Sequence, residues 1–463
     1  MAQYLLCSTP VHGHVVPMTS IGRHLVSLGH RVTMLTGSRF EDRVRASGMD
    51  FRPLRGRADY DDRDNAATLP DRDRYRGLAQ AQYDIQTLFV ATIPAQYRSV
   101  RALLDELRPD AVLTDTAFAG VTPWLFAGPE GRPPMLGVGV TPLTQLGRDV
   151  APSGMALPPS STRLGRIRNR SLNVLASKVL FRPTQRVAER MFAEIGAPKP
   201  SMFVMDVSRA FDRFLQLSAR EFEYPRSDLS ENVRFVGALP SDAAPPATAS
   251  PSASTEGTGV GAGAGTDSAA ASELPSWWPD LRSGAPVVHV TQGTIDNHDL
   301  DRLIRPTITA LAQLPVTVVV TMGGRPTDAL GPAAPLPGNV RVASYLPYDE
   351  LLPLTDVFVT NGGYGGVQQA LGAGVPLVVA GGTEDKPEVA ARVGWAGVGV
   401  DLRTGTPTPD AVYDAVLATL SQPDYRSRAQ ALAATMARYD ALATIDGELT
   451  DAVARTLRAR VAD

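Results

Sequence analysis

The chain has 463 residues, too many for one comfortable core and enough for two domains of roughly 200 residues each. Apolar residues make up 43%, as in soluble globular proteins, and the net charge of -3 gives no electrostatic reason to expect a nucleic-acid partner. A single cysteine, Cys7, excludes an intramolecular disulfide. Without a recognisable secretory signal, and without an apolar run near the roughly 20 residues of a membrane helix, we expect a cytoplasmic protein with no integral membrane segment.

The first 36 residues are typical of a βαβ unit. Gln3–Ser8 is a short apolar strand, and a loop with Pro, Gly and two histidines follows it. Proline is tolerated in the first helical turn, so Pro17 is predicted to open a helix. Arg31–Thr36 is the second strand, and a later strand from residue 111 to 114 ends at Asp115.

The second half repeats this alternation. Strands are predicted at 286–291, 317–321, 357–360 and 377–380. A helix running to Leu314 is expected to start at the turn Gln292-Gly293-Thr294, and another, ending at Ala373, follows the glycine-rich loop Asn361–Gly366. Strands that alternate with helices indicate parallel sheets covered on both faces. The fold class is therefore α/β, with two Rossmann-like parallel-sheet domains that face each other.

The composition marks the domain boundaries. Residues 241–272 are nearly all Ala, Gly, Ser, Thr and Pro, which predicts a disordered linker. The expected division is a first domain over 1–238, a linker region over 239–284, a second domain over 285–440 and a C-terminal helix over 441–463 that returns to the first domain. Residues 163–190 carry seven Arg and one Lys against one acid. That stretch fits a solvated basic helix face, with guidance of an anionic acceptor or contact with a membrane surface left open.

Three loops carry the candidate chemistry, because ligands of open parallel sheets bind beyond the carboxyl ends of the strands. The first loop places His12 and His14 at a strand-to-helix turn, and histidine is suited to accept a proton near neutral pH. The second loop, Gln292–Thr294, combines a turn with a hydroxyl. The third loop, Asn361–Gly366, has four glycines before a helix whose N-terminus can receive phosphate.

Together these loops resemble the nucleotide-sugar glycosyltransferases of the GT-B fold, in particular the macrolide, antibiotic and plant-flavonoid glycosyltransferases. The resemblance covers about 1–238 and 285–440. It rests on Gly13–Pro17 and on four motifs that occur in the family's order: Tyr345-Leu346-Pro347, Asn361-Gly362-Gly363, Gly374-Val375-Pro376 and Glu384-Asp385-Lys386.

The resemblance implies a role for each motif. His14 is the expected general base and Asp115 the carboxylate that orients it, while His12 matches less specifically. Tyr345 is expected to stack on the nucleotide base, and Leu346 to present its backbone to the base edge. The remaining donor-binding positions are Gln292, Gly293, Thr294, Gly363, Gly365 and Gly366 near the diphosphate, with Asp385 and Lys386 at the sugar.

Three positions depart from the family pattern. Asn361 stands where a histidine usually faces the diphosphate, Gln369 where a glutamate usually binds the ribose, and Lys386 where a glutamine usually contacts the sugar. These departures affect the expected donor more than the expected reaction.

The implied reaction is inverting, metal-independent transfer of a hexose from UDP-glucose or a dTDP-sugar to a hydroxyl of an apolar small molecule. The expected partners are that donor, acting as co-substrate with no further cofactor, and an acceptor such as a macrolide, polyketide or phenolic. Two alternatives remain open: a nucleotide-sugar 2-epimerase of the same fold, and a non-catalytic protein that binds the nucleotide sugar or the aglycone.

Overall fold

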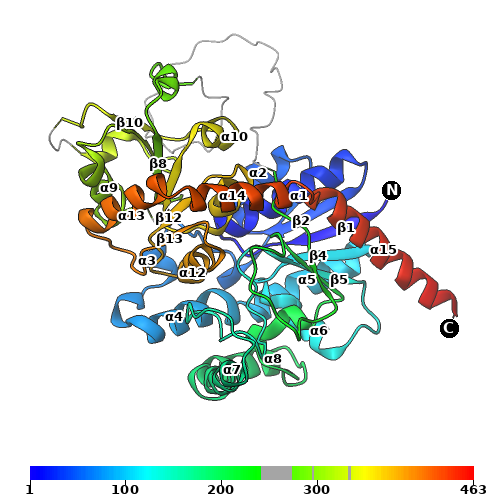
Figure 1. Cartoon of the computed structure of the whole chain (residues 1–463). Coiled ribbons are helices and arrows are strands. Elements are labelled where there is room, and N and C mark those ends of the chain that lie inside the picture. The colour runs from blue at the N-terminus through cyan, green and yellow to red at the C-terminus, as the bar shows by residue number, and fades with distance from the viewer. Residues whose placement is uncertain (241–273, 295–296, 332–334, 463) are drawn as a thin grey trace, which may run out of the picture.

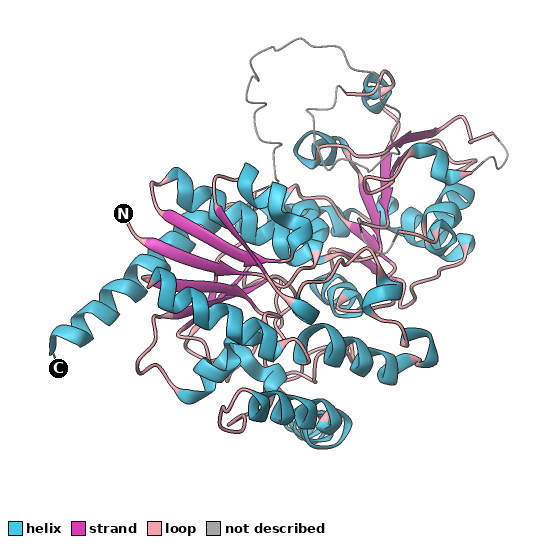
Figure 2. Ribbon diagram, turned by 180° about the vertical axis from the view of Figure 1, so that it is seen from behind, coloured by secondary structure: helices cyan, strands magenta, loops and turns pink. Residues whose placement is uncertain are grey.

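The computed structural model describes residues 1–240, 274–294, 297–331 and 335–462. The expected disordered linker, residues 241–272, lies outside the described residues. Two separate parallel sheets dominate the described chain, and helices cover both faces of each (Figures 1 and 2). The predicted α/β class with two parallel-sheet domains is therefore confirmed.

The first sheet is built entirely from the N-terminal half. Its order is β3-β2-β1-β4-β5-β6-β7, and every neighbouring pair is parallel. The strands are β1 (Gln3–Cys7), β2 (Arg31–Thr36), β3 (Asp50–Pro53), β4 (Ala111–Asp115), β5 (Met135–Gly139), β6 (Arg213–Gln216) and β7 (Val233–Phe235).

The second sheet follows the undescribed segment. Its order is β10-β9-β8-β11-β12-β13, again parallel throughout. The strands are β8 (Val287–Thr291), β9 (Thr317–Thr321), β10 (Val340–Ala343), β11 (Val357–Thr360), β12 (Leu377–Val379) and β13 (Gly399–Asp401). The central strands are valine-rich and fully buried, as expected for strands covered on both faces.

Helices connect the strands and pack on both sides of each sheet. Those of the first half are α1 (His12–Ser27), α2 (Glu41–Ala46), α3 (Asn65–Thr68), α4 (Gly77–Ile85), α5 (Ile93–Leu107), α6 (Thr122–Ala127), α7 (Arg163–Leu175) and α8 (Arg182–Glu194). Those of the second half are α9 (Ile304–Leu311), α10 (Tyr348–Leu351), α11 (Tyr364–Gly372), α12 (Lys386–Ala396), α13 (Pro409–Ser421), α14 (Pro423–Met436) and α15 (Ala441–Ala462). In the described ranges, no helix is long and apolar enough to cross a membrane.

The last helix crosses from the second domain to the first. It runs from the end of α14 past α1 (Figure 1), and its residues Ile445 and Leu449 are buried in the same apolar core as β1 and α1. The C-terminus of the chain thus ties the two domains together by packing rather than by the connecting segment alone.

The predicted start of the first helix is wrong. The helix begins at His12, and Pro17 lies inside it rather than at its opening. The amides of His14 and Val15 both donate to the Val11 carbonyl, and the carboxylate of Asp62 accepts from the amide of His12 at 2.7 Å. This tertiary contact stabilises an extra turn before the proline, and that turn contains His14.

The predicted start of the helix after Gln292–Thr294 is also wrong. Thr294 is exposed and does not start a helix, because α9 begins only at Ile304. The side-chain oxygen of Gln292 accepts from the amides of Leu303 and Ile304, at 3.2 and 3.0 Å. Gln292, which was expected near the diphosphate, therefore uses its side chain to cap α9.

Candidate active site

The candidate base is held by a buried carboxylate at the edge of the first sheet. His14 lies in the first turn of α1, directly after β1, and Asp115 is the last residue of the neighbouring strand β4. Nδ1 of His14 is 2.8 Å from Oδ1 of Asp115. The side chain of Asp115 is fully buried, whereas 12% of the His14 side chain is exposed. The structure therefore brings together the two residues that the resemblance paired.

Asp115 is itself fixed by backbone donors. Its two oxygens accept from the amides of Thr9 at 2.6 Å and Ala117 at 2.8 Å. These contacts fix the position of the carboxylate. A carboxylate that accepts from Nδ1 requires the proton on that nitrogen of the imidazole, which leaves Nε2 to accept a proton from another molecule.

The surroundings of His14 favour its protonated form. Burial lowers the pKa of the imidazole, but the charge of Asp115 and the hydrogen bond to it outweigh burial, so the pKa is raised above its ordinary value. The charges of Asp385 and Glu384, from the second domain, act in the same direction. The base of the first domain is thus within electrostatic reach of the residues expected at the donor sugar.

The candidate donor loops all lie at the carboxyl edge of the second sheet. Tyr345 and Leu346 follow β10, Gln292–Thr294 follow β8, the loop 361–366 follows β11, and 384–386 follow β12. Because the sheet order is β10-β9-β8-β11-β12, these loops form a row in that sequence. Tyr345 is 54% exposed, whereas Leu346 is buried in the core behind it.

The glycine-rich loop leads into α11 and leaves helix amides available. Gly363 precedes the helix, and no side chain caps it. The amides of the first turn have no partner within an α-helix, and they carry the positive end of its dipole. An added Cβ at Gly365 would meet no atom within 4 Å, so open space lies in front of this turn. Gln369 lies one turn further along the same helix, half-buried.

The side chain of Asn361 is engaged within the protein. Its Nδ2 donates to the carbonyl oxygen of Gln292 at 2.5 Å, and the residue is buried. The contact joins the loops after β8 and β11. Beside it, Gly293 has a φ of +74° and Gly362 a φ of +91°, both in the left-handed region that glycine favours.

The acidic turn before α12 contains an ion pair between a buried lysine and an exposed glutamate. The ammonium of Lys386, the first residue of the helix, pairs with the carboxylate of Glu384, and only 8% of the lysine side chain is exposed. Burial raises the pKa of Asp385, and the charge of Glu384 adds to it, against the lowering effects of Lys386 and His14. The turn therefore carries groups of both signs, of which Glu384 and Asp385 act electrostatically on His14.

Direct hydrogen bonds join the two domains beside this site. The side-chain amide of Gln216, at the end of β6, donates to the hydroxyl of Tyr364 in α11 at 3.2 Å. One turn later in α11, Gln368 donates to Ser218 at 3.0 Å. The helix whose first turn is expected to bind phosphate is thus docked on the first domain.

One residue that shapes the site was not predicted from the sequence. Asp62 accepts from the amide of His12 and forms an ion pair with Arg39. It lies in the run Asp59–Asp64, which contains four aspartates, so no local signal distinguished it. Within the described ranges, no three His, Cys, Asp or Glu side chains are grouped as metal ligands.

The chain is similar to known proteins along nearly its whole length. Residues 305–450 match the family described as erythromycin biosynthesis protein CIII-like, C-terminal domain. The chain is 37% identical to 4'-demethylrebeccamycin synthase of Lentzea aerocolonigenes, over 96% of this chain and 99% of that protein. It is 36% identical to UDP-glycosyltransferase 2 of Phaeomoniella chlamydospora, over 97% and 95% of the two chains. The crystal structure of the kitacinnamycin glycosyltransferase shares the fold, with a TM-score of 0.68 at 22% identity over 97% and 98% of the chains.

Proposed function

Because this chain belongs to the GT-B glycosyltransferase family of macrolide and antibiotic glycosyltransferases, we propose that it transfers a hexose from UDP-glucose or a dTDP-sugar to a hydroxyl of an apolar small molecule, with inversion at the anomeric carbon. The acceptor class we propose is a macrolide, polyketide or phenolic. The observation that carries the proposal is the 2.8 Å contact between His14 and the buried Asp115, within electrostatic reach of the turn 384–386.

In the proposed reaction, Nε2 of His14 takes the proton of the acceptor hydroxyl as its oxygen attacks the anomeric carbon. The bond between that carbon and the diphosphate oxygen breaks, and the nucleotide diphosphate leaves with the electron pair. A single displacement from the opposite side inverts the anomeric configuration. Asp115 holds the imidazole in the required tautomer and stabilises the imidazolium that forms.

The order of the donor loops supports a nucleotide sugar as the donor. A nucleotide sugar is a linear molecule in which base, ribose, diphosphate and sugar follow one another. Along the sheet edge, an exposed aromatic side chain (Tyr345) comes first, the open helix start of α11 next, and the polar turn 384–386 last. Adjacent strands lie about 4.8 Å apart, so a donor bound along this row would extend across several strands.

The first turn of α11 supports the proposal that no metal is needed. Free backbone amides and the positive end of a helix dipole stabilise phosphate charge, and these groups need no rearrangement as the diphosphate leaves. We propose that Gly363, Gly365 and Gly366 supply this contact and that the nucleotide sugar is the only co-substrate. The cytoplasmic location expected from the sequence remains part of the proposal.

A screen of donors and acceptors read by mass spectrometry tests the function. The protein is incubated with UDP-glucose or a dTDP-sugar, with and without macrolide, polyketide and phenolic alcohols. The proposal predicts an acceptor that gains the mass of one hexose, and NMR of the product should show the inverted anomer. A donor converted without any acceptor would indicate the epimerase instead, and nucleotide binding without turnover would indicate a non-catalytic protein.

A further inference from the structure

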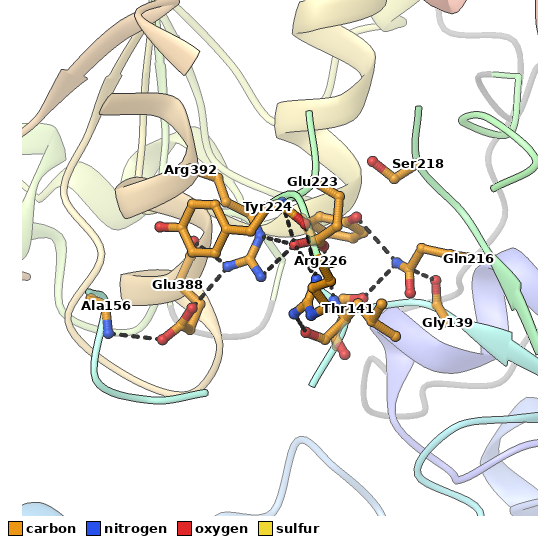
Figure 3. Close-up of polar contacts among 12 residues, drawn as sticks. Gly139, Thr141, Ala156, Gln216, Ser218, Glu223, Tyr224, Arg226, Glu388 and Arg392 are labelled. Carbon is orange, nitrogen blue, oxygen red and sulfur yellow. Dashed lines mark hydrogen bonds and ion pairs between the residues drawn. The ribbon is translucent and has the colours of Figure 1, made fainter. Parts of the chain in front are cut away.

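Four buried charged side chains, two from each domain, meet at the boundary between the domains. Glu223 and Arg226 lie in the loop after β6 of the first domain, and Glu388 and Arg392 lie in α12 of the second (Figure 3). Arg392 is 1% exposed, Glu223 2% and Glu388 5%. Burying charges is unfavourable unless they are paired and hydrogen-bonded, so the contacts made here decide whether this network is stable.

Arg392 joins the two carboxylates. Its Nε is 2.8 Å and its Nη2 2.6 Å from Oε1 of Glu223, while its Nη1 is 2.8 Å from Oε2 of Glu388. The guanidinium also lies over the ring of Tyr224, 4.2 Å from its centroid. The start of α12 is therefore fixed against the first domain.

The same carboxylates hold one loop of the first domain at two places. The loop runs from the end of β5 to the start of α7, residues 140–162. Near its beginning, the amide of Leu143 donates to Glu223 at 3.0 Å, and the Leu143 carbonyl accepts from Arg226 at 2.8 Å. Further along, the amides of Gly154 and Ala156 both donate to Oε1 of Glu388, each at 2.8 Å.

The backbone that donates to Glu388 includes two residues in the left-handed conformation. Gly154 has a φ of +97°, and Ala156, which carries a side chain, has a φ of +52°. The left-handed region is unfavourable for a residue with a Cβ and persists where the surroundings impose it. The shared carboxylate oxygen of Glu388 is the group that draws both amides to one point, and it belongs to the other domain.

This loop begins next to the candidate base pair. Val138 of β5 lies opposite Asp115 of β4 in the sheet, and its carbonyl accepts from the amide of Thr116 at 3.0 Å. On the side of the second domain, Glu388 lies two residues after Lys386, at the start of α12. Glu388 therefore links the helix that follows the turn expected at the donor sugar with a loop that begins beside Asp115.

We propose that Glu388 is a positioning residue for the acceptor: from the donor domain, it fixes the shape of the 140–162 loop, so that the acceptor binds well only when α12 is seated on the first domain. This inference rests on the proposed function, since it assumes an acceptor in the first domain. It assigns acceptor affinity partly to a residue that touches neither substrate.

Hydrogen exchange and kinetics of Glu388→Ala test the inference on the full-length protein. Without substrates, we expect amide exchange in peptides spanning 150–158 to be at least tenfold faster than in the wild type, with α11 unchanged. With the acceptor and donor found in the screen, we expect the acceptor KM to rise at least fivefold. The affinity for the nucleotide diphosphate, measured by calorimetry, should stay within twofold. If Glu388 contributed only to stability, Glu388→Ala would not raise the acceptor KM while leaving the diphosphate affinity unchanged.

Glu388→Gln is the conservative companion: its amide oxygen can still accept from both loop amides, while the contact with Nη1 of Arg392 is lost and the contacts of Arg392 with Glu223 remain. It should keep the acceptor KM within twofold of the wild type. Asp424→Ala, at an exposed carboxylate on α14, is the matched control and should change none of these values. Unchanged loop exchange in Glu388→Ala, or an acceptor KM that does not rise, would overturn the inference. A wild-type enzyme that transfers sugar to no acceptor would instead overturn the proposed function, and the exchange experiment would still report on the loop.

Discussion

At the scale of single residues, the imidazole of His14 is controlled by a carboxylate whose own position is fixed. Asp115 accepts from two backbone amides as well as from His14, so the direction of its contact with Nδ1 is set by the ends of β1 and β4. A group that orients a base in this way affects both its tautomer and its pKa. Changes at this pair should therefore affect the kinetics of the reaction more directly than the stability of the protein.

The acidic limb of the pH profile should depend on Asp115. The proposed base works in its neutral form, so kcat/KM should rise with pH through the pKa of His14 in the free enzyme, which is raised above its ordinary value. Asp115→Asn removes the charge that favours the imidazolium, which lowers this pKa and moves the acidic limb to lower pH. The maximal rate should also fall, because an amide stabilises the developing positive charge less well. A limb that stayed in place would show that another group titrates.

Lys386 should influence the choice of donor. Its side chain is buried and pairs with Glu384, at the position where the resemblance implies a neutral glutamine. We expect Lys386→Gln to change the ratio of kcat/KM between UDP-glucose and other nucleotide sugars, because it changes the charge beside the sugar hydroxyls. Lys199→Gln, at an exposed lysine of the first domain, is the control. Equal effects on every donor would argue against a contact between Lys386 and the sugar.

At the scale of elements, the first turn of α11 follows a glycine in the left-handed conformation and contains another glycine that faces open space. Gly362 has a φ of +91°, and an added Cβ there would lie 2.9 Å from Cγ1 of Val379. Three residues on, Gly365 is inside the helix with open space before it. We therefore expect the fold to require Gly362 and diphosphate binding to require Gly365.

Alanine substitutions at the two positions should have opposite effects on the stability of the protein. Gly365→Ala should stabilise the protein by up to about 1 kcal/mol, because alanine favours the helix. It should also weaken nucleotide diphosphate binding, since the methyl group enters the space before the helix amides. Gly362→Ala should lower the melting temperature, because the left-handed backbone and the contact with Val379 both oppose a Cβ. Calorimetry of unfolding and of diphosphate binding measures both; a Gly365→Ala variant with undiminished affinity would place the phosphate elsewhere.

The accuracy of the sequence analysis also differs between elements. The bounds of β2, β9 and β11 coincide with the predicted strands, because short apolar runs between turn residues define buried strands locally. The starts of α1 and α9 were wrong, because the side chains of Asp62 and Gln292 satisfy their first amides from distant or irregular positions. The network around Glu388 depends on two domains meeting, and no spacing in the sequence indicates that contact.

At the scale of the whole molecule, the two domains are joined by described contacts that do not involve the segment 241–272. They include the hydrogen bonds from Gln216 and Gln368, the ion pair of Arg392 with Glu223, the hydrogen bonds to Glu388, and the packing of α15 on the first core. The proposed catalytic pair belongs to one domain and the candidate donor loops to the other. Their assembly should therefore survive large changes in the connecting chain.

Shortening that segment tests this independence. Replacing residues 241–272 with a shorter Gly/Ser segment should leave turnover within a few-fold of the wild type, provided that it still spans the domains. The measurement is steady-state kinetics beside diphosphate titration on the same preparation. A loss of donor binding on shortening would show that the segment contributes to the site.

The division of labour between the domains is tested most directly by His14→Ala, assayed by steady-state kinetics and by calorimetric titration with the nucleotide diphosphate. The account predicts that kcat falls by about 10²–10⁴-fold, the usual contribution of a general base. The diphosphate affinity should remain nearly unchanged, because the donor loops lie after the strands of the other sheet. His12→Ala, made as a neighbouring control, should lose less. Near-normal turnover in His14→Ala would contradict the assignment of the base, and loss of diphosphate binding with the fold intact would place His14 in the donor site instead.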